Sequence, residues 1–155
     1  MKAETSESSS KFVRTKKIVN GVGVLFCAQN TNRHLFLLRN DKNVQTWGLP
    51  GGKCERDESL LESLERECHE EIQYWPESIK LFPIEKFTSE DNNFVYHTFY
   101  ALLPEEFIPV LNHEHIGFAW IDSKTYPKPL HRGLFSTLNY PIIQQKIEII
   151  HQSLK

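Results

Sequence analysis

Three glutamates, Glu67, Glu70 and Glu71, lie within five positions of a predicted helix, and Arg66 directly precedes them. Carboxylates three or four residues apart on a helix are about 5–6 Å apart at Cβ. Each close pair repels by roughly 0.7 kcal/mol in water and by about 3 kcal/mol at an effective dielectric constant of 20. These positions also belong to the last turns of the helix, where the helix dipole disfavours negative charge. A divalent cation would convert this repulsion into binding, so the cluster predicts a metal site.

A second interpretation of the same residues is an acidic helix face exposed to water, with Arg66 and His69 as partial compensation. For the glutamate run alone, the exposed face is the more common arrangement, and it is the longer pattern described below that favours the metal site. At about 100° per residue, Glu67 and Glu71 lie about 40° apart at one edge of the apolar arc, and Glu70 lies about 60° further round. All three side chains can therefore point into one crevice.

The helix itself is predicted from its apolar spacing and its end signals. Ser59, with Glu62 three positions later, forms a capping box at the start. Pro76 disfavours helical geometry in the residue before it, so we expect the helix to span residues 60 to 73. Five residues share an apolar arc of roughly 120° and are expected to face the core: Leu60, Leu61, Leu64, Cys68 and Ile72.

A longer pattern of fixed spacing surrounds the cluster. Gly52 is followed after five residues by Glu58, and after seven more by Arg66 and the three glutamates. This resembles the Nudix box, G-x5-E-x7-R-E-U-x-E-E-x-G-U with U an apolar residue, in every charged position. The run Trp47–Lys53 is similar to the usual lead-in to that box. The resemblance implies a MutT-like Nudix hydrolase of the α/β class, an α/β/α sandwich with a mixed β-sheet between helices.

The resemblance also implies a role for each matched residue. Glu67, Glu70 and Glu71 would hold one or more divalent metal ions, usually Mg²⁺, and the backbone carbonyl of Gly51 would add a ligand. Glu67 is also a candidate base for the attacking water, and Arg66 would orient the acidic side chains. Oxygen ligands without a histidine or cysteine set favour Mg²⁺ or Mn²⁺ over Zn²⁺. Metal ions can neutralise phosphate charge, activate water and align the two.

One position departs from the family pattern, because Gln73 stands where the box has a glycine. That glycine suits a left-handed helix end, where a residue with a Cβ costs on the order of 1 kcal/mol or more. The departure puts in doubt the shape of the helix end and the chain path after it. It leaves the carboxylates unchanged.

Beyond the box, Glu114 precedes a predicted strand that ends in Trp120. Many Nudix enzymes have a glutamate in this region as an extra metal ligand or base, so Glu114 is a candidate catalytic residue. The alternative is an exposed loop glutamate. His113 and His115 flank it and could titrate near neutral pH.

The segment 127–134 is similar to short bacterial and phage Nudix proteins. Within it, Lys128, His131 and Arg132 are candidates for contact with substrate phosphate, and solvent exposure is the alternative for each. Four aromatic residues could stack on a nucleobase or pack in the core: Trp47, Tyr96, Phe118 and Tyr126. We select Arg132, His131 and Trp47 as the substrate-binding set.

The 155 residues are expected to form one domain over residues 11–155, preceded by a disordered tail over residues 1–10. A formal charge of −2 gives no broad attraction to duplex nucleic acid. Three irregularly spaced cysteines favour neither a disulfide framework nor a zinc site. No apolar run is long enough for a membrane span. A cytoplasmic enzyme is expected, and a homodimer is left open.

The remaining elements follow from apolar patterning and turn residues. A strand over residues 17–28 is expected to bend at Gly21 or Gly23. Further strands are expected at 34–38, 79–88, 94–103 and 116–121, and helices at 132–138 and 142–154. Strands on both sides of a central helix, followed by terminal helices, indicate a mixed sheet with helices on each face.

Three functions are consistent with these features. The first is hydrolysis of a nucleoside diphosphate derivative such as ADP-ribose, a dinucleoside polyphosphate, FAD or a nucleotide sugar. The second is pyrophosphate release from a nucleoside triphosphate. The third is a non-catalytic nucleotide sensor, which the retention of Glu67, Glu70 and Glu71 disfavours.

Overall fold

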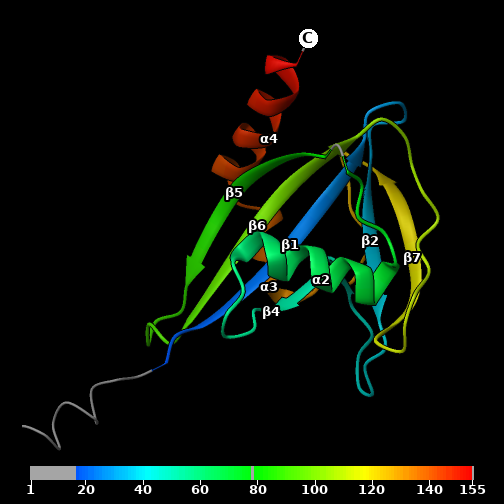
Figure 1. Cartoon of the computed structure of the whole chain (residues 1–155). Coiled ribbons are helices and arrows are strands. Elements are labelled where there is room, and N and C mark those ends of the chain that lie inside the picture. The colour runs from blue at the N-terminus through cyan, green and yellow to red at the C-terminus, as the bar shows by residue number, and fades with distance from the viewer. Residues whose placement is uncertain (1–16, 78, 155) are drawn as a thin grey trace, which may run out of the picture.

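A computed structural model describes residues 17–77 and 79–154, and the tail predicted over residues 1–10 lies outside them. Figure 1 shows a mixed sheet with helix α2 on one face and helices α3 and α4 on the other. This arrangement confirms the predicted α/β/α sandwich. The helices are α2 (Leu60–Ile72), α3 (Arg132–Leu138) and α4 (Pro141–Ser153).

The sheet of seven strands has the order β3-β2-β1-β6-β5, with β4 also paired to β1 and β7 paired to β2. Its longest pairing is parallel, between β1 and β6 over ten positions from Val19↔Phe94 to Ala28↔Leu103. The strands are β1 (Val19–Ala28), β2 (Arg33–Arg39), β3 (Trp47–Gly48), β4 (Gly51–Lys53), β5 (Lys80–Thr88), β6 (Phe94–Leu103) and β7 (His115–Asp122).

Two apolar cores lie on opposite faces of the sheet, because successive strand residues point to opposite sides. On β1, Val22, Val24 and Phe26 belong to the core under α2. Leu25 and Cys27 belong to the core under α3 and α4. The central strand β1 is therefore apolar on both faces.

Two local predictions differ from the structure. Leu61 was expected in the core but is 52% exposed, because the buried face of α2 is turned toward Ser63 and Glu67 instead. The bend predicted at Gly21 or Gly23 is absent, since β1 is continuous. These glycines instead make room for the ring of Tyr96: a Cβ on Gly21 would lie 2.8 Å from Tyr96 Cδ1, and one on Gly23 would lie closer still to the hydroxyl.

Candidate functional site

Helix α2 carries the box carboxylates, and both of its ends have a defined cap structure. At its start, the Ser59 hydroxyl accepts a hydrogen bond from the Glu62 amide at 3.1 Å, and the Glu62 carboxylate accepts one from the Ser59 amide at 2.8 Å. At its end, Gln73 adopts the left-handed conformation with φ 51° and ψ 41°. The helix end thus keeps the shape that suits a glycine, although Gln73 carries a Cβ.

Glu67 and Glu71 lie on the buried face of α2, only 9% and 2% exposed. Their carboxyl groups meet strand β4. The Gly51 amide donates a hydrogen bond to Glu71 Oε1 at 3.2 Å, and a Cβ on Gly52 would lie 2.6 Å from the Glu67 carboxyl carbon. Neighbouring atoms lie so close to the backbone at positions 51 and 52 that both residues must be glycine. Gly51 also has φ +151°, and a Cβ there would overlap the Val22 carbonyl oxygen.

The two buried carboxyl groups are hydrogen-bonded to each other, and the pKa of Glu71 is raised well above its ordinary value. Burial is the main cause, because it disfavours the charged form. The hydrogen bond with Glu67 adds to the rise, as does the charge of Glu114, while the Gly51 amide opposes it. Without a cation, the protonated form of Glu71 is therefore favoured.

Arg66 forms hydrogen bonds with three of the four box glutamates. Its Nε and Nη2 donate to the two oxygens of Glu58 at 2.6 and 2.9 Å, and its Nη1 donates to Glu67 Oε1 at 2.9 Å. The same nitrogen reaches Glu70 Oε2 at 3.2 Å. Chiefly because of the Arg66 hydrogen bonds, the pKa of Glu58 falls to about 2. Arg66 thus fixes the Glu67 carboxylate against β4.

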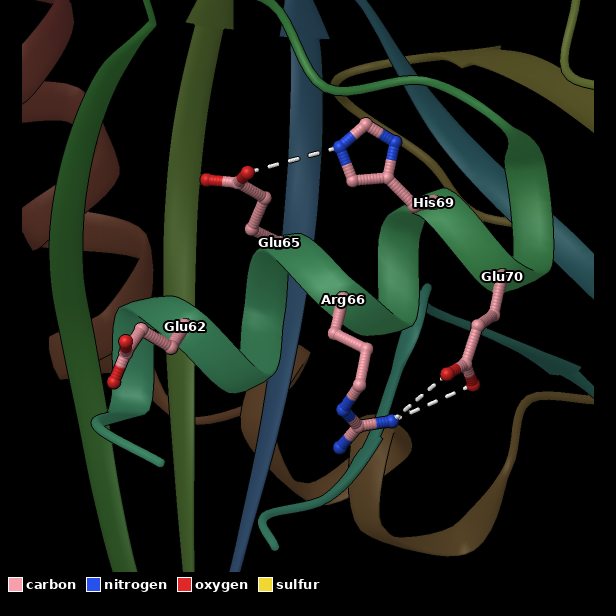
Figure 2. Close-up of a pocket in the computed structure, with 5 residues that line it drawn as sticks. All are labelled: Glu62, Glu65, Arg66, His69 and Glu70. Carbon is pink, nitrogen blue, oxygen red and sulfur yellow. Dashed lines mark hydrogen bonds and ion pairs between the residues drawn. The ribbon is translucent and has the colours of Figure 1, made fainter. Parts of the chain in front are cut away.

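Glu70 does not join the buried pair. Its side chain is 51% exposed, and Figure 2 shows it and Arg66 pointing toward each other on the outer side of α2. A shallow hollow there is lined by Glu62, Glu65, Arg66, His69 and Glu70. The expectation that all three glutamates point into one crevice therefore holds only for Glu67 and Glu71.

The buried pair fits a divalent cation in its donor chemistry. Carboxylate oxygens and backbone carbonyls are the ligands that Mg²⁺ and Mn²⁺ prefer, and a cation would neutralise the charge that burial disfavours on Glu71. In the part of the chain that the structure describes, no group of three or more His, Cys, Asp or Glu side chains is gathered for a metal. Glu70 would have to leave Arg66 to complete such a set.

Glu114 lies in an exposed position directly before β7. Its amide donates to the Asn112 side chain at 3.0 Å, and its charge contributes to the raised pKa of Glu71. His115 is 8% exposed, and burial lowers its pKa. Among the described residues, His115 Nδ1 is a buried side-chain atom that lacks a hydrogen-bond partner.

A cavity of about 760 Å³ lies on the face of the sheet that carries α3, next to the two glycines of β4. Gly51 and Gly52 line it and also contact Glu71 and Glu67. Strand β4 is thus in contact with both the cavity and the buried carboxyl pair. The other lining residues are Gly21, Arg39, Gly48, Leu49, Lys53, Glu85, Phe87, Phe94, Tyr96, Thr98, His131, Arg132, Gly133, Leu134, Ser136 and Thr137.

The family model of the NUDIX domain matches residues 17–139. The chain belongs to the Nudix family. This assignment makes it a hydrolase of pyrophosphate bonds, in a family whose members generally use a divalent metal ion. A comparison with curated proteins found no match.

Solved Nudix structures share the fold of this chain at low sequence identity. A Nudix hydrolase from M. smegmatis is 18% identical, with 90% of this chain and 88% of that chain covered at a TM-score of 0.65. A MutT Nudix hydrolase from Burkholderia pseudomallei is 21% identical, with 79% and 97% covered at 0.63. The E. coli dihydroneopterin triphosphate pyrophosphohydrolase is 24% identical, with 69% and 84% covered at 0.56.

The structure places two of the three residues selected for substrate binding in the cavity. His131 and Arg132 line the cavity on the α3 face of the sheet. Trp47 does not, because its side chain packs against the core under α3 and α4. Tyr126 packs against the same core. Of the four aromatic residues considered as stacking partners of a nucleobase, Tyr96 lines the cavity.

Three charged residues of the cavity were not predicted from the sequence: Arg39, Lys53 and Glu85. Lys53 directly follows the glycines of the Nudix lead-in, so its place in the motif was an available signal. Arg39 and Glu85 lie on β2 and β5, two strands that do not pair with each other. Only the strand order brings them to one cavity, and no local pattern in the sequence reports it.

No helix among the described residues has both the length and the apolar character that a membrane span requires.

Proposed function

We propose that this Nudix hydrolase cleaves the diphosphate link of a nucleoside diphosphate derivative in a Mg²⁺-dependent reaction. ADP-ribose, dinucleoside polyphosphates, FAD and nucleotide sugars are the substrate classes, and two phosphorylated products would leave. The observation that carries the proposal is the carboxyl pair of Glu67 and Glu71 against a glycine strand that also lines a large cavity. We also propose a cytoplasmic location for the enzyme.

Glu67, Glu71 and the Gly51 carbonyl would hold Mg²⁺, with Mn²⁺ as a substitute, and Glu70 would join them on leaving Arg66. When bound, the cation supplies neutralisation of phosphate charge and a more acidic water. Arg66 keeps Glu67 aligned through its contact at 2.9 Å while its remaining donors hold Glu58. Glu67 and Glu114 are the candidates for accepting the proton of the attacking water.

The cavity supports a nucleotide-sized substrate. Ligand cavities commonly measure about 300–1,000 Å³, and this one measures about 760 Å³. Arg39, Lys53 and Arg132 line it, and none of the three forms a salt bridge with a described residue. Such unpaired cations are suited to phosphate oxygens.

The test is incubation of the purified protein with Mg²⁺ and a panel of nucleoside diphosphate derivatives and nucleoside triphosphates, followed by separation of the products. We expect two phosphorylated products from at least one diphosphate derivative and no turnover with EDTA. Pyrophosphate release from triphosphates alone would instead support the triphosphate pyrophosphohydrolase. Binding without turnover of any compound would support a sensor and refute the proposal.

A further inference from the structure

Between α3 and β5, the cavity contains an acidic group that diphosphate hydrolysis does not require. Glu85 and Thr137 both line the cavity, and the Thr137 hydroxyl donates a hydrogen bond to Glu85 Oε1. Glu85 is half-buried, and among residues 17–77 and 79–154 no cationic side chain forms an ion pair with it. Its carboxylate is held in place and keeps acceptor capacity for a ligand.

Aromatic side chains lie beside this carboxylate on the same face of the sheet. Alternate residues of a strand share a face, so Phe87 follows Glu85 on β5. The register places Glu85 opposite Thr98 and Phe87 opposite Tyr96. Together with Phe94, these rings give the cavity an aromatic lining next to a hydrogen-bond acceptor.

The charges in the cavity are arranged along the strand order. Arg39 comes from β2 and Lys53 from β4, on one side of β1, whereas Glu85 comes from the edge strand β5 beyond β6. Cations therefore lie on the side of the Glu67–Glu71 pair, and the acceptor lies on the other side. A nucleotide has the complementary order, with phosphates at one end and the donors of a base at the other.

We propose that Glu85 selects a guanine-type base in this cavity, an inference that rests on the proposed function because it assigns the base end of the same substrate. Among the proposed substrate classes, it favours guanine-containing dinucleoside polyphosphates and nucleotide sugars over ADP-ribose and FAD. Guanine presents its N1–H and its amino group side by side, and a carboxylate can accept from both. Adenine and cytosine present an unprotonated ring nitrogen beside the amino group, which would repel a carboxylate oxygen. Uracil presents one N–H between two carbonyl oxygens.

The test is isothermal titration of the full chain with GDP, ADP and dGDP in the presence of Mg²⁺. We expect wild-type protein to bind GDP at least about tenfold more tightly than ADP, the effect of one or two hydrogen bonds to a charged acceptor. Glu85→Gln should remove most of that preference, because the amide can still accept from Thr137 but offers one acceptor oxygen. Glu90→Gln, on the turn of the same hairpin and outside the cavity, should keep it.

Equal affinities for GDP and ADP in the wild type would overturn the proposal, as would a guanine preference that survives Glu85→Gln. A loss for both nucleotides in Glu85→Gln, combined with weaker binding of dGDP than GDP, would show that Glu85 binds ribose and would also overturn it. Base selectivity is measured here without turnover. Failure of the proposed hydrolysis would therefore leave a guanine preference intact, and hydrolysis with no base preference would refute only the role of Glu85.

Discussion

Glu71 is 2% exposed, and its carboxyl group lies beside Glu67 with the Gly51 amide as a favourable partner for its charge. Neighbouring carboxylates in a buried place are unfavourable unless one is protonated or a cation binds both. The same residue therefore destabilises the metal-free protein when ionised and is required by the proposed reaction. These two effects can be separated by a substitution that removes only the charge.

We expect Glu71→Gln to keep or raise the metal-free melting temperature, because the amide retains a hydrogen bond with Gly51 and carries no charge. Hydrolysis should fall by at least about 100-fold, since a proposed metal ligand is lost. Differential scanning fluorimetry and the hydrolysis assay measure the two effects. Glu65→Gln, an exposed glutamate on the same helix, is the control and should change neither. A fully active Glu71→Gln protein would exclude Glu71 as a ligand.

Gly52 gives a second prediction at the scale of one residue. A Cβ at this position would lie 2.6 Å from Glu67 Oε2, and Arg66 holds the other Glu67 oxygen at 2.9 Å. Gly52→Ala should therefore displace the carboxylate, lower activity at least about tenfold, and cost about 1–3 kcal/mol of unfolding free energy.

The matched control is Gly117→Ala, where the nearest atom to an added Cβ is 3.7 Å away. Denaturant titration and activity measurements on both variants compare an overlapping methyl group with one in ordinary contact. If Gly52→Ala kept full activity, Glu67 would not need its present position.

At the scale of elements, the residue that ends the Nudix helix has an unfavourable backbone conformation. Gln73 has φ 51°, a left-handed conformation in which a side chain costs on the order of 1 kcal/mol. We expect Gln73→Gly to raise the unfolding free energy by about 0.5–1 kcal/mol with little change in activity, as measured by denaturant titration. Gln145→Gly, at an exposed position inside α4, should lower it by a similar amount. Destabilisation by Gln73→Gly would contradict the strained helix end.

The elements that sequence patterning predicted are those long enough to show a period. The capping box and apolar spacing gave α2 within one residue, and the strands paired in the β5–β6 hairpin were also expected. Strands β3 and β4 have two and three residues, too few for any alternation to be visible. Their positions depend on pairing with β2 and β1, which is a tertiary contact.

At the scale of the whole molecule, the candidate site has two parts, and the sequence predicted only one of them. The carboxylates of α2 were found because one motif places them on one helix. The cavity was not found, because it joins Arg39, Glu85 and Thr137 from three elements whose proximity follows from strand order. The sequence did not predict the direction of the Glu70 side chain either. Glu70 accepts a hydrogen bond from Arg66 and does not join the buried pair.

The stability of the whole chain should depend on pH through Glu71 and, at lower pH, through His34. The pKa of Glu71 is raised to about 9, so the folded state binds a proton that the unfolded state has lost above its ordinary value of 4.5. Metal-free stability should therefore fall as pH rises toward 9, by at most about 1.4 kcal/mol per pH unit. Burial lowers the pKa of His34 to about 4 from 6.5, which gives the opposite dependence below pH 6.5.

Between pH 6.5 and 9 the His34 effect is absent, and the Glu71 effect can be assigned by cation addition. Mg²⁺ binding would stabilise the ionised pair, so the rise in melting temperature caused by Mg²⁺ should increase with pH. Melting temperatures in EDTA and in Mg²⁺ across this range measure the effect, with Glu71→Gln as the variant that lacks the titrating group. Parallel pH profiles of wild type and Glu71→Gln in EDTA would show that Glu71 does not titrate in this range, and the raised pKa of Glu71 would then be wrong.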